Sequence, residues 1–313
     1  MADGFYKELM LTGGYSENDR WQAGSGTLKN SVGFEYFKKQ SNDYGDLWTF
    51  DLQVRAAYND NFNQSDAFGV EIHNAWLEYN LGLGKSLTIG HFDPAFGLEP
   101  VLDTHGTLLQ TLALKNIGYK KDWGISYKGF LGDYDYQLAA QLGSGMGIRR
   151  QDGSYLFTAR IAEPQTKDSK FGISFLFGKT LQSKQSWTIP AAELAGDCAV
   201  EKKRIGIDYQ GTLGILDFKT EAAVGDNDGT AVGGIMAELG FTVPEEQNIK
   251  VKIQGMYWSD DRDRNDKRDL TLAPVIEYIL NPESTVRLGY FHDIYSRNGN
   301  DRAVMLQFYY YGL

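Results

Sequence analysis

The sequence alternates apolar and polar side chains over many short segments. In one such segment the charged Lys250 and Lys252 stand on either side of Val251. A repeat of two is the period of a β-strand that has one apolar and one polar face. Similar segments lie near residues 5–15, 28–38, 46–58, 70–80, 86–91, 122–131, 136–143, 154–162, 170–179, 201–210, 215–224, 231–242, 248–258, 267–279, 284–295 and 302–313. The pattern therefore predicts an all-β protein with about sixteen strands.

The connections between the predicted strands alternate in length. Every second connection is long, and this set comprises residues 16–27, 59–69, 92–121, 144–153, 180–200, 225–230, 259–266 and 296–301. The other set is short and comprises residues 39–45, 81–85, 132–135, 163–169, 211–214, 243–247 and 280–283. Long extracellular loops, short periplasmic turns and an even strand count are typical of a bacterial outer-membrane barrel. We therefore expect residues 1–313 to form one transmembrane antiparallel β-barrel.

The alternation has a second interpretation, because a half-buried sheet in a soluble β-sandwich would show it too. The two interpretations differ in where the apolar face points. In a membrane barrel the apolar side chains face lipid, since an exposed Lys or Arg at mid-bilayer costs roughly 2–4 kcal/mol. The segregated loop lengths favour the barrel, and a soluble β-rich binding protein is the alternative.

Composition agrees with a barrel. The chain has 36 Gly, 19 Tyr and 17 Phe but only 7 Pro, which suits many strands and tight turns. The mean hydropathy of −0.40 does not argue against a membrane, because a polar-lined barrel shows its apolar face only at every second residue. The net charge of −10 argues against nucleic acid as a partner. Cys198 is the single cysteine, so neither a disulfide nor a cysteine metal site is predicted.

The predicted barrel implies a location in the bacterial outer membrane, in contact with lipid and lipopolysaccharide. A secreted barrel needs a signal peptide, and the chain begins Met1-Ala2-Asp3-Gly4 without an apolar leader. We therefore expect a leader to have been removed. The mixed charge run from Asp260 to Arg268 is interpreted as a solvated external loop, with a divalent-ion bridge to lipopolysaccharide as the alternative.

One stretch resembles a known family. The segment from His91 to Pro100, HFDPAFGLEP, is similar to the motif of the phosphate-selective (O/P type) porins, written roughly G-x-F-x-x-P-F-G-L-E. The segments 115–118, 122–124 and 136–138 also resemble that family in type and spacing, and the similarity is greatest over residues 83–180. The chain departs from outer-membrane proteins at its end, where Leu313 replaces the usual Phe.

The resemblance implies that the long segment 92–121 folds back into the barrel and narrows a pore. Its apolar residues would pack the loop against the inner wall. The resemblance also implies a homotrimer. An extracellular flap with no role in transport is the other interpretation of the same segment. The expected constriction residues are Asp93, Phe96, Glu99, Asp103 and His105.

Within each predicted strand, every second side chain points into the barrel, and we call these positions the inward parity. Charged side chains at these positions would line the pore. The basic set is Arg55, Lys128, Arg160, Arg204, Lys219, Lys250, Lys252 and Arg287. The acidic set is Glu35, Asp51, Glu78, Asp135, Asp208, Asp217, Glu221, Glu238 and Glu277. Because the sets are balanced, many members are expected to form ion pairs that brace the wall. The loop residues are acidic, so phosphate selectivity is not carried over from the family.

These features predict a porin, a passive diffusion channel for small hydrophilic solutes or ions that is weakly selective or prefers cations. A barrel that sleeves a partner such as a redox protein is an alternative, and it would need an empty lumen. A channel selective for phosphate or other anions is another. The sequence predicts no enzyme, metal or cofactor, since Asn74 beside His73 is too common a pair to mark a catalytic site. The segment 226–229 is interpreted as a turn because it lacks the distal Glu of a calcium loop.

Overall fold

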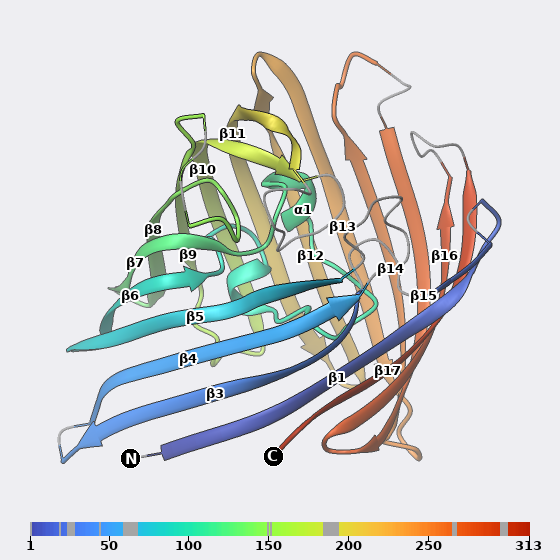
Figure 1. Ribbon diagram of the computed structural model, residues 1–313, viewed down its shortest axis with the longest axis horizontal. Coiled ribbons are helices and arrows are strands. Elements are labelled where there is room, and N and C mark those ends of the chain that lie inside the picture. Colours follow the sequence, from blue (N-terminus) through green and yellow to red (C-terminus); the bar gives the residue numbers. More distant parts are fainter. Residues whose placement is uncertain are drawn as a thin grey trace.

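The computed structural model describes residues 2–18, 20–23, 29–43, 45–58, 68–148, 150, 152–183, 194–264, 268–294 and 300–313. Antiparallel strands dominate it (Figure 1). The strands are β1 (Ala2–Ser16), β2 (Arg20–Ala23), β3 (Asn30–Asn42), β4 (Gly45–Tyr58), β5 (Phe68–Gly82), β6 (Lys85–Phe92), β7 (Asp122–Leu131), β8 (Tyr134–Gln141), β9 (Tyr155–Ala162), β10 (Ser169–Ser183), β11 (Leu194–Leu213), β12 (Leu216–Asn227), β13 (Thr230–Thr242), β14 (Ile249–Ser259), β15 (Arg268–Asn281), β16 (Ser284–Asp293) and β17 (Asp301–Gly312). Two short helices, η1 (Glu99–Val101) and α1 (Ala113–Asn116), lie between β6 and β7.

The sheet closes on itself. Strand β1 pairs with β17 from Lys7↔Gly312 to Ser16↔Ala303, and with β3 over its first half. The four-residue β2 is a short arm paired with β1, which leaves sixteen of the 17 strands in the wall. Closure removes the unpaired edges that an open sheet could not leave in lipid. The prediction of a sixteen-stranded antiparallel barrel is confirmed, and both chain termini lie at the same end of it (Figure 1).

The two faces of the wall differ as the alternation predicts. On β10, Phe175 and Phe177 are exposed, whereas the alternate residues Ser174 and Leu176 are buried. The exposed apolar side chains form the outer surface, and the alternate side chains, most of them polar or packed against the segment inside the barrel, face the lumen. Neither described helix is long or apolar enough to cross a membrane.

The segment between β6 and β7 lies inside the barrel, where Figure 1 shows α1 surrounded by strands. Its apolar residues Phe96, Leu98, Leu112, Ile117 and Tyr119 are buried. They pack on inward side chains of β9, β10 and β12–β14, namely Leu156, Leu176, Ala223, Val232, Met236 and Trp258. Wall hydroxyls also accept backbone hydrogen bonds from the segment, since Gly97 N donates to Ser174 Oγ at 3.0 Å. We call residues 93–121 the inner loop.

Several predicted boundaries were wrong. Residues 194–200 belong to β11 although they were expected in a connection, and Gly211 lies within that strand rather than in a turn. The expected connection 225–230 shrinks to the two-residue turn Asp228-Gly229, with φ of 47° and 86°. Left-handed backbone at both positions matches the twist of a tight hairpin, so the strands continue farther than their polar ends suggest. Parts of the expected connections 16–27, 59–69, 144–153, 180–200, 259–266 and 296–301 lie outside the described residues.

Candidate functional site

The inner loop fills the lumen unevenly. A hollow of about 290 Å³, which we call the lumen cavity, lies between the loop and the inner face of β4 and β5. A second hollow of about 110 Å³ adjoins it toward β6–β8, and Trp76, Asp93 and Pro100 line both. The lumen cavity is lined by Asp51, His73, Asn74, Trp76, Asp93, Glu99, Pro100, Val101, Leu102, Asp103, Thr104, His105, Lys120 and Lys121. Four of the five residues expected at the constriction therefore face one space.

Asp93 is held by a lysine from the far end of the same loop. Lys121 Nζ donates to Asp93 Oδ1 and Oδ2 at 2.7 and 2.8 Å. Burial by itself would lower the pKa of Lys121, but the Asp93 and Asp103 carboxylates outweigh burial and raise this pKa. Lys121 is therefore charged at neutral pH, and it neutralises Asp93 at the cavity wall.

Glu99 is buried more deeply than Asp93. Its Oε2 accepts a hydrogen bond from the Thr111 hydroxyl group. Burial raises the pKa of Glu99 to about 7, although the Lys120 ammonium group acts in the opposite direction. Lys120 donates to the Thr104 hydroxyl and to the Gln110 side-chain oxygen, and burial lowers its pKa. The cavity therefore contains a carboxyl group that titrates near neutral pH.

The tip of the loop carries Asp103 and His105, which have different environments. Asp103 is exposed within the lumen, and its Oδ1 accepts a hydrogen bond from His105 N at 2.8 Å. The buried His105 ring lies between Arg55 Nη1, 2.6 Å from its Nδ1, and the Glu8 carboxylate at its Nε2. His105 therefore anchors the tip to β1 and β4, whereas Asp103 faces the open lumen.

Phe96 and Glu221 hold the loop against the wall and lie away from the lumen cavity. The Phe96 ring sits against Gly206 of β11, where an added Cβ would approach the ring to 2.8 Å. Glu221 of β12 is buried, and it accepts hydrogen bonds from Leu98 N at 3.3 Å and from Asn116 Nδ2 at 3.0 Å. Glu221 was expected to line the pore, but its carboxyl group accepts hydrogen bonds from the inner loop instead.

Most wall charges expected in the pore form ion pairs with neighbouring strands. Arg160 contacts Asp208 through Nε at 3.1 Å and Nη2 at 2.5 Å. Lys219 pairs with Glu238 at 2.8 Å. Lys252 and Arg287 both bind Glu277 at 2.9 Å, and Arg287 also donates to Gly106 O of the inner loop at 2.6 Å. Arg55 pairs with Glu71 at 2.8 Å, as does Lys29. These pairs brace the wall and leave little net charge on it.

The remaining predicted charges are scattered. Lys128 and Glu78 pair at 3.3 Å beside the smaller hollow. Arg204 donates to the Lys203 and Asp226 carbonyl oxygens at 2.8 and 2.6 Å. Asp217 is exposed at the start of β12, where Thr212 donates to it at 3.2 Å, and Lys250 is paired in register with Glu277. Of the wall charges predicted for the pore, Asp51 is the one that lines the lumen cavity.

Sequence reasoning did not single out Trp76, Lys120 or Lys121 as site residues. The two lysines adjoin Asp122, the first residue of β7, in a Tyr-Lys-Lys-Asp run that looks like an ordinary solvated turn. Trp76 stands directly opposite Asp51 in the β4–β5 register. Its position of inward parity was the available signal, but Trp258 and several large aliphatic side chains of the wall also point inward.

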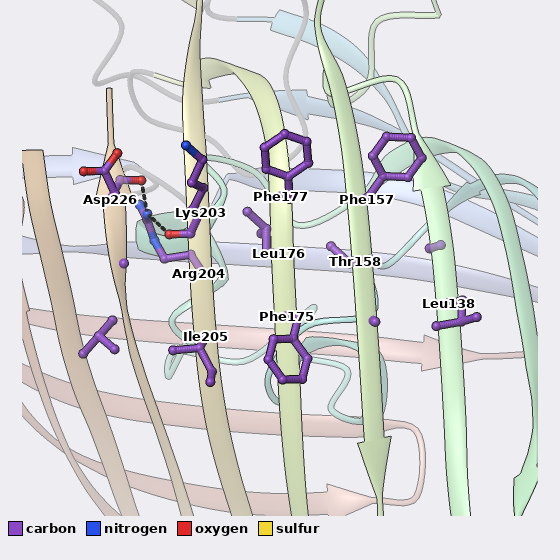
Figure 2. A pocket seen from close by; sticks show the side chains of 14 residues that line it. Leu138, Phe157, Thr158, Phe175, Leu176, Phe177, Lys203, Arg204, Ile205 and Asp226 are labelled. Carbon is purple, nitrogen blue, oxygen red and sulfur yellow. Dashed lines mark hydrogen bonds between the residues drawn. The ribbon is translucent and has the colours of Figure 1, made fainter. Parts of the chain in front are cut away.

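Another hollow lies on the outer surface and is not part of the lumen. It is a groove of about 710 Å³ over β8–β12, lined by outward side chains such as Phe157, Phe175, Phe177 and Ile205. Figure 2 shows the three Phe rings and Ile205 around the groove, with Arg204 hydrogen-bonded to the carbonyl oxygens of Lys203 and Asp226. The groove belongs to the apolar outer surface. Within the described ranges, no group of three or more His, Cys, Asp or Glu residues could hold a metal ion.

The sequence matches no family model and no curated protein. The fold, in contrast, is similar to those of several solved outer-membrane proteins. The anion-selective porin from Comamonas acidovorans superposes with a TM-score of 0.67 at 11% identity, covering 99% of both chains. The chain has the fold of the bacterial porins.

Two further structures support this similarity. OmpF of Salmonella typhi, solved with daunomycin, has a TM-score of 0.69 at 9% identity and covers 99% of this chain and 97% of its own. The outer-membrane channel DcaP of Acinetobacter baumannii has a TM-score of 0.62 at 14% identity and covers 99% and 96%. At such identities the comparison establishes the shared architecture, and the site must be argued from this chain's own residues.

Proposed function

We propose that this protein is a porin of the bacterial outer membrane, a passive diffusion channel for small hydrophilic solutes or ions. The observation that carries the proposal is a closed barrel with an apolar outer surface and a polar cavity beside an inner loop. A closed barrel satisfies every wall strand's backbone in lipid, and a polar lumen offers a path for water and solutes. The inner loop then forms the constriction.

Weak cation preference is part of the proposal. Four carboxyl groups line the cavity, on Asp51, Asp93, Glu99 and Asp103, against the two lysines at positions 120 and 121. Fixed charge at a narrow point biases which ions enter, provided that it does not hold them too tightly. The acidic excess therefore favours cations. The Lys120-Lys121 pair is the feature that supports the alternative of a phosphate or anion channel, as in the family that the sequence resembles.

Two other expectations bear on this proposal. A sleeve for a partner protein needs an empty lumen, whereas the inner loop occupies this one and packs on strands from β9 to β17. The homotrimer implied by the resemblance remains a proposal, as does contact with lipid and lipopolysaccharide through the apolar outer surface. A soluble binding protein would leave that outer surface exposed to water, which is unfavourable.

Planar-bilayer recording tests the function. The folded protein is inserted into a bilayer, and the reversal potential is measured under a salt gradient. We expect stable ohmic steps and a small reversal potential of the sign for cations. Absence of conductance from a correctly folded barrel would contradict the channel, and strong anion selectivity would favour the alternative.

A further inference from the structure

The carboxyl groups of the lumen cavity are not equally neutralised. Lys121 binds both oxygens of Asp93, and the Lys120 ammonium group is the strongest opposing charge for Glu99. Lys121 also acts on Asp51 and Asp103 through its charge, and Lys120 acts on Asp103. Asp51 and Asp103 line the cavity from two different elements, since Asp51 belongs to β4 and Asp103 to the loop tip.

Asp51 is an unusual residue for a wall position. Only 4% of it is exposed, and its Oδ1 has no hydrogen-bond partner among the described residues. The Asn74 side chain and the Glu35 carboxyl group from β3 both interact with Asp51 through hydrogen bonds, and the Glu35 charge adds negative potential. Burying a charged carboxyl group is costly, and a second acid beside it increases the cost. A positive group that entered the cavity would offset this cost at Asp51.

The apolar part of the cavity lies next to these acids. Trp76 is the direct cross-strand neighbour of Asp51 on β5, so the two side chains stand side by side on the same face. Val101 and Leu102 of the loop line the same cavity. The indole face attracts organic cations, and the neighbouring aliphatic groups accept an apolar body.

We propose that the lumen cavity is a binding subsite for organic cations. An ammonium or guanidinium group lies between Asp51 and Asp103, and the apolar part of the solute contacts Trp76. This inference deepens the proposed function and rests on it for its role in transport. A bare divalent ion does not fit equally well, because no described group of three or more His, Cys, Asp or Glu residues could hold a metal.

The test uses the full chain folded in detergent and three matched probes, namely 2-phenylethylammonium, neutral 2-phenylethanol and phenylacetate. Binding is measured by titration calorimetry, and block of the ionic current is measured in planar bilayers with the same probes. We expect the ammonium probe to bind at least about tenfold more tightly than the other two and to produce brief current interruptions.

Variants locate the site. Asp51→Asn and Asp103→Asn should each weaken binding of the ammonium probe by roughly three- to tenfold, and Trp76→Leu by a similar factor. Asp217→Asn is the matched control, because it removes one inward-parity charge at an exposed position outside the cavity. Heat-modified gel mobility checks that every variant folds as a barrel.

The outcomes separate the two proposals. Equal affinity for the three probes, or an Asp217→Asn effect as large as that of Asp51→Asn, would overturn the subsite even if the channel conducts. Selective binding that Asp51→Asn weakens, in a barrel that passes no current, would support the subsite and overturn the channel. Selective binding together with current block supports both.

Discussion

The two sides of the lumen differ in how they meet the inner loop. On the side of β9–β14, Phe96, Leu98 and Leu112 pack into an apolar cluster with the wall. On the side of β4 and β5, the same loop leaves a polar cavity lined by Asp51, Trp76 and its own acids and lysines. Apolar contact holds the loop in place on one side, whereas on the other side the polar His105 anchors the loop tip beside the cavity. The cavity therefore lies on the polar face of a loop that is held on both sides.

The largest expected effect comes from breaking the packed side. Leu98 is fully buried in the apolar cluster, and its backbone N–H faces the Glu221 carboxylate. Leu98→Asp places an unpaired charge there, at a cost on the order of several kcal/mol. We expect the loop to leave the wall and single-channel conductance to rise. Leu83→Asp, at an exposed turn, is the control, and equal conductance in both variants would contradict the anchoring role.

A smaller effect is expected from the polar anchor on the same side. Glu221→Ala removes the acceptor for Leu98 N and Asn116 Nδ2 and leaves two buried donors unsatisfied. Each such group costs about 1–3 kcal/mol, so the loop should fluctuate more without leaving the lumen. Open-channel current noise should increase, while the mean conductance changes less than in Leu98→Asp. The exposed Glu246→Ala should leave the noise unchanged.

On the open side, the Asp93–Lys121 pair allows opposite changes. Asp93→Asn removes an acid and frees the Lys121 charge, so the cation preference should fall. Lys121→Gln leaves Asp93 unneutralised, so this preference should rise. Each change should alter the permeability ratio by roughly two- to fivefold, which reversal potentials under a salt gradient would detect. The exposed Lys85→Gln provides the control, and a shift of the same sign in both cavity variants would refute the pairing argument.

The smallest expected effect is a dependence on pH. Burial raises the pKa of Glu99 to about 7, so this carboxyl group is charged above neutral pH and gains a proton below it. The cation preference should therefore decrease as the pH falls from about 8 to about 6. Glu99→Gln should show the low-pH selectivity at both values. A variant that retains the full pH dependence would show that another group is responsible.

The wall could be predicted from the sequence because strand alternation is a local property. Each segment such as 248–258 carries its own two-residue repeat. The outward direction of a Phe or Ile can therefore be predicted without knowing which strands lie beside it. The strand ends could not be predicted in this way, because the tight hairpin at Asp228-Gly229 keeps polar residues within the hydrogen-bonded strands. The resemblance of HFDPAFGLEP to a porin motif identified the inner loop and its acidic residues.

The roles of the charged residues could not be predicted in the same way. Arg160 and Asp208 are 48 positions apart, and Glu8 and His105 are 97 apart, so their pairing depends on register and barrel closure. Glu221 and Asp51 have the same inward parity, yet one satisfies the loop backbone and the other lines the cavity. Inward parity places a charge in the lumen, but the strand register and the path of the loop together decide which partner it meets. The alternation of apolar and polar residues is visible within a single strand. Neutralisation of a charged side chain depends on which distant segments the closed wall and the inner loop bring together.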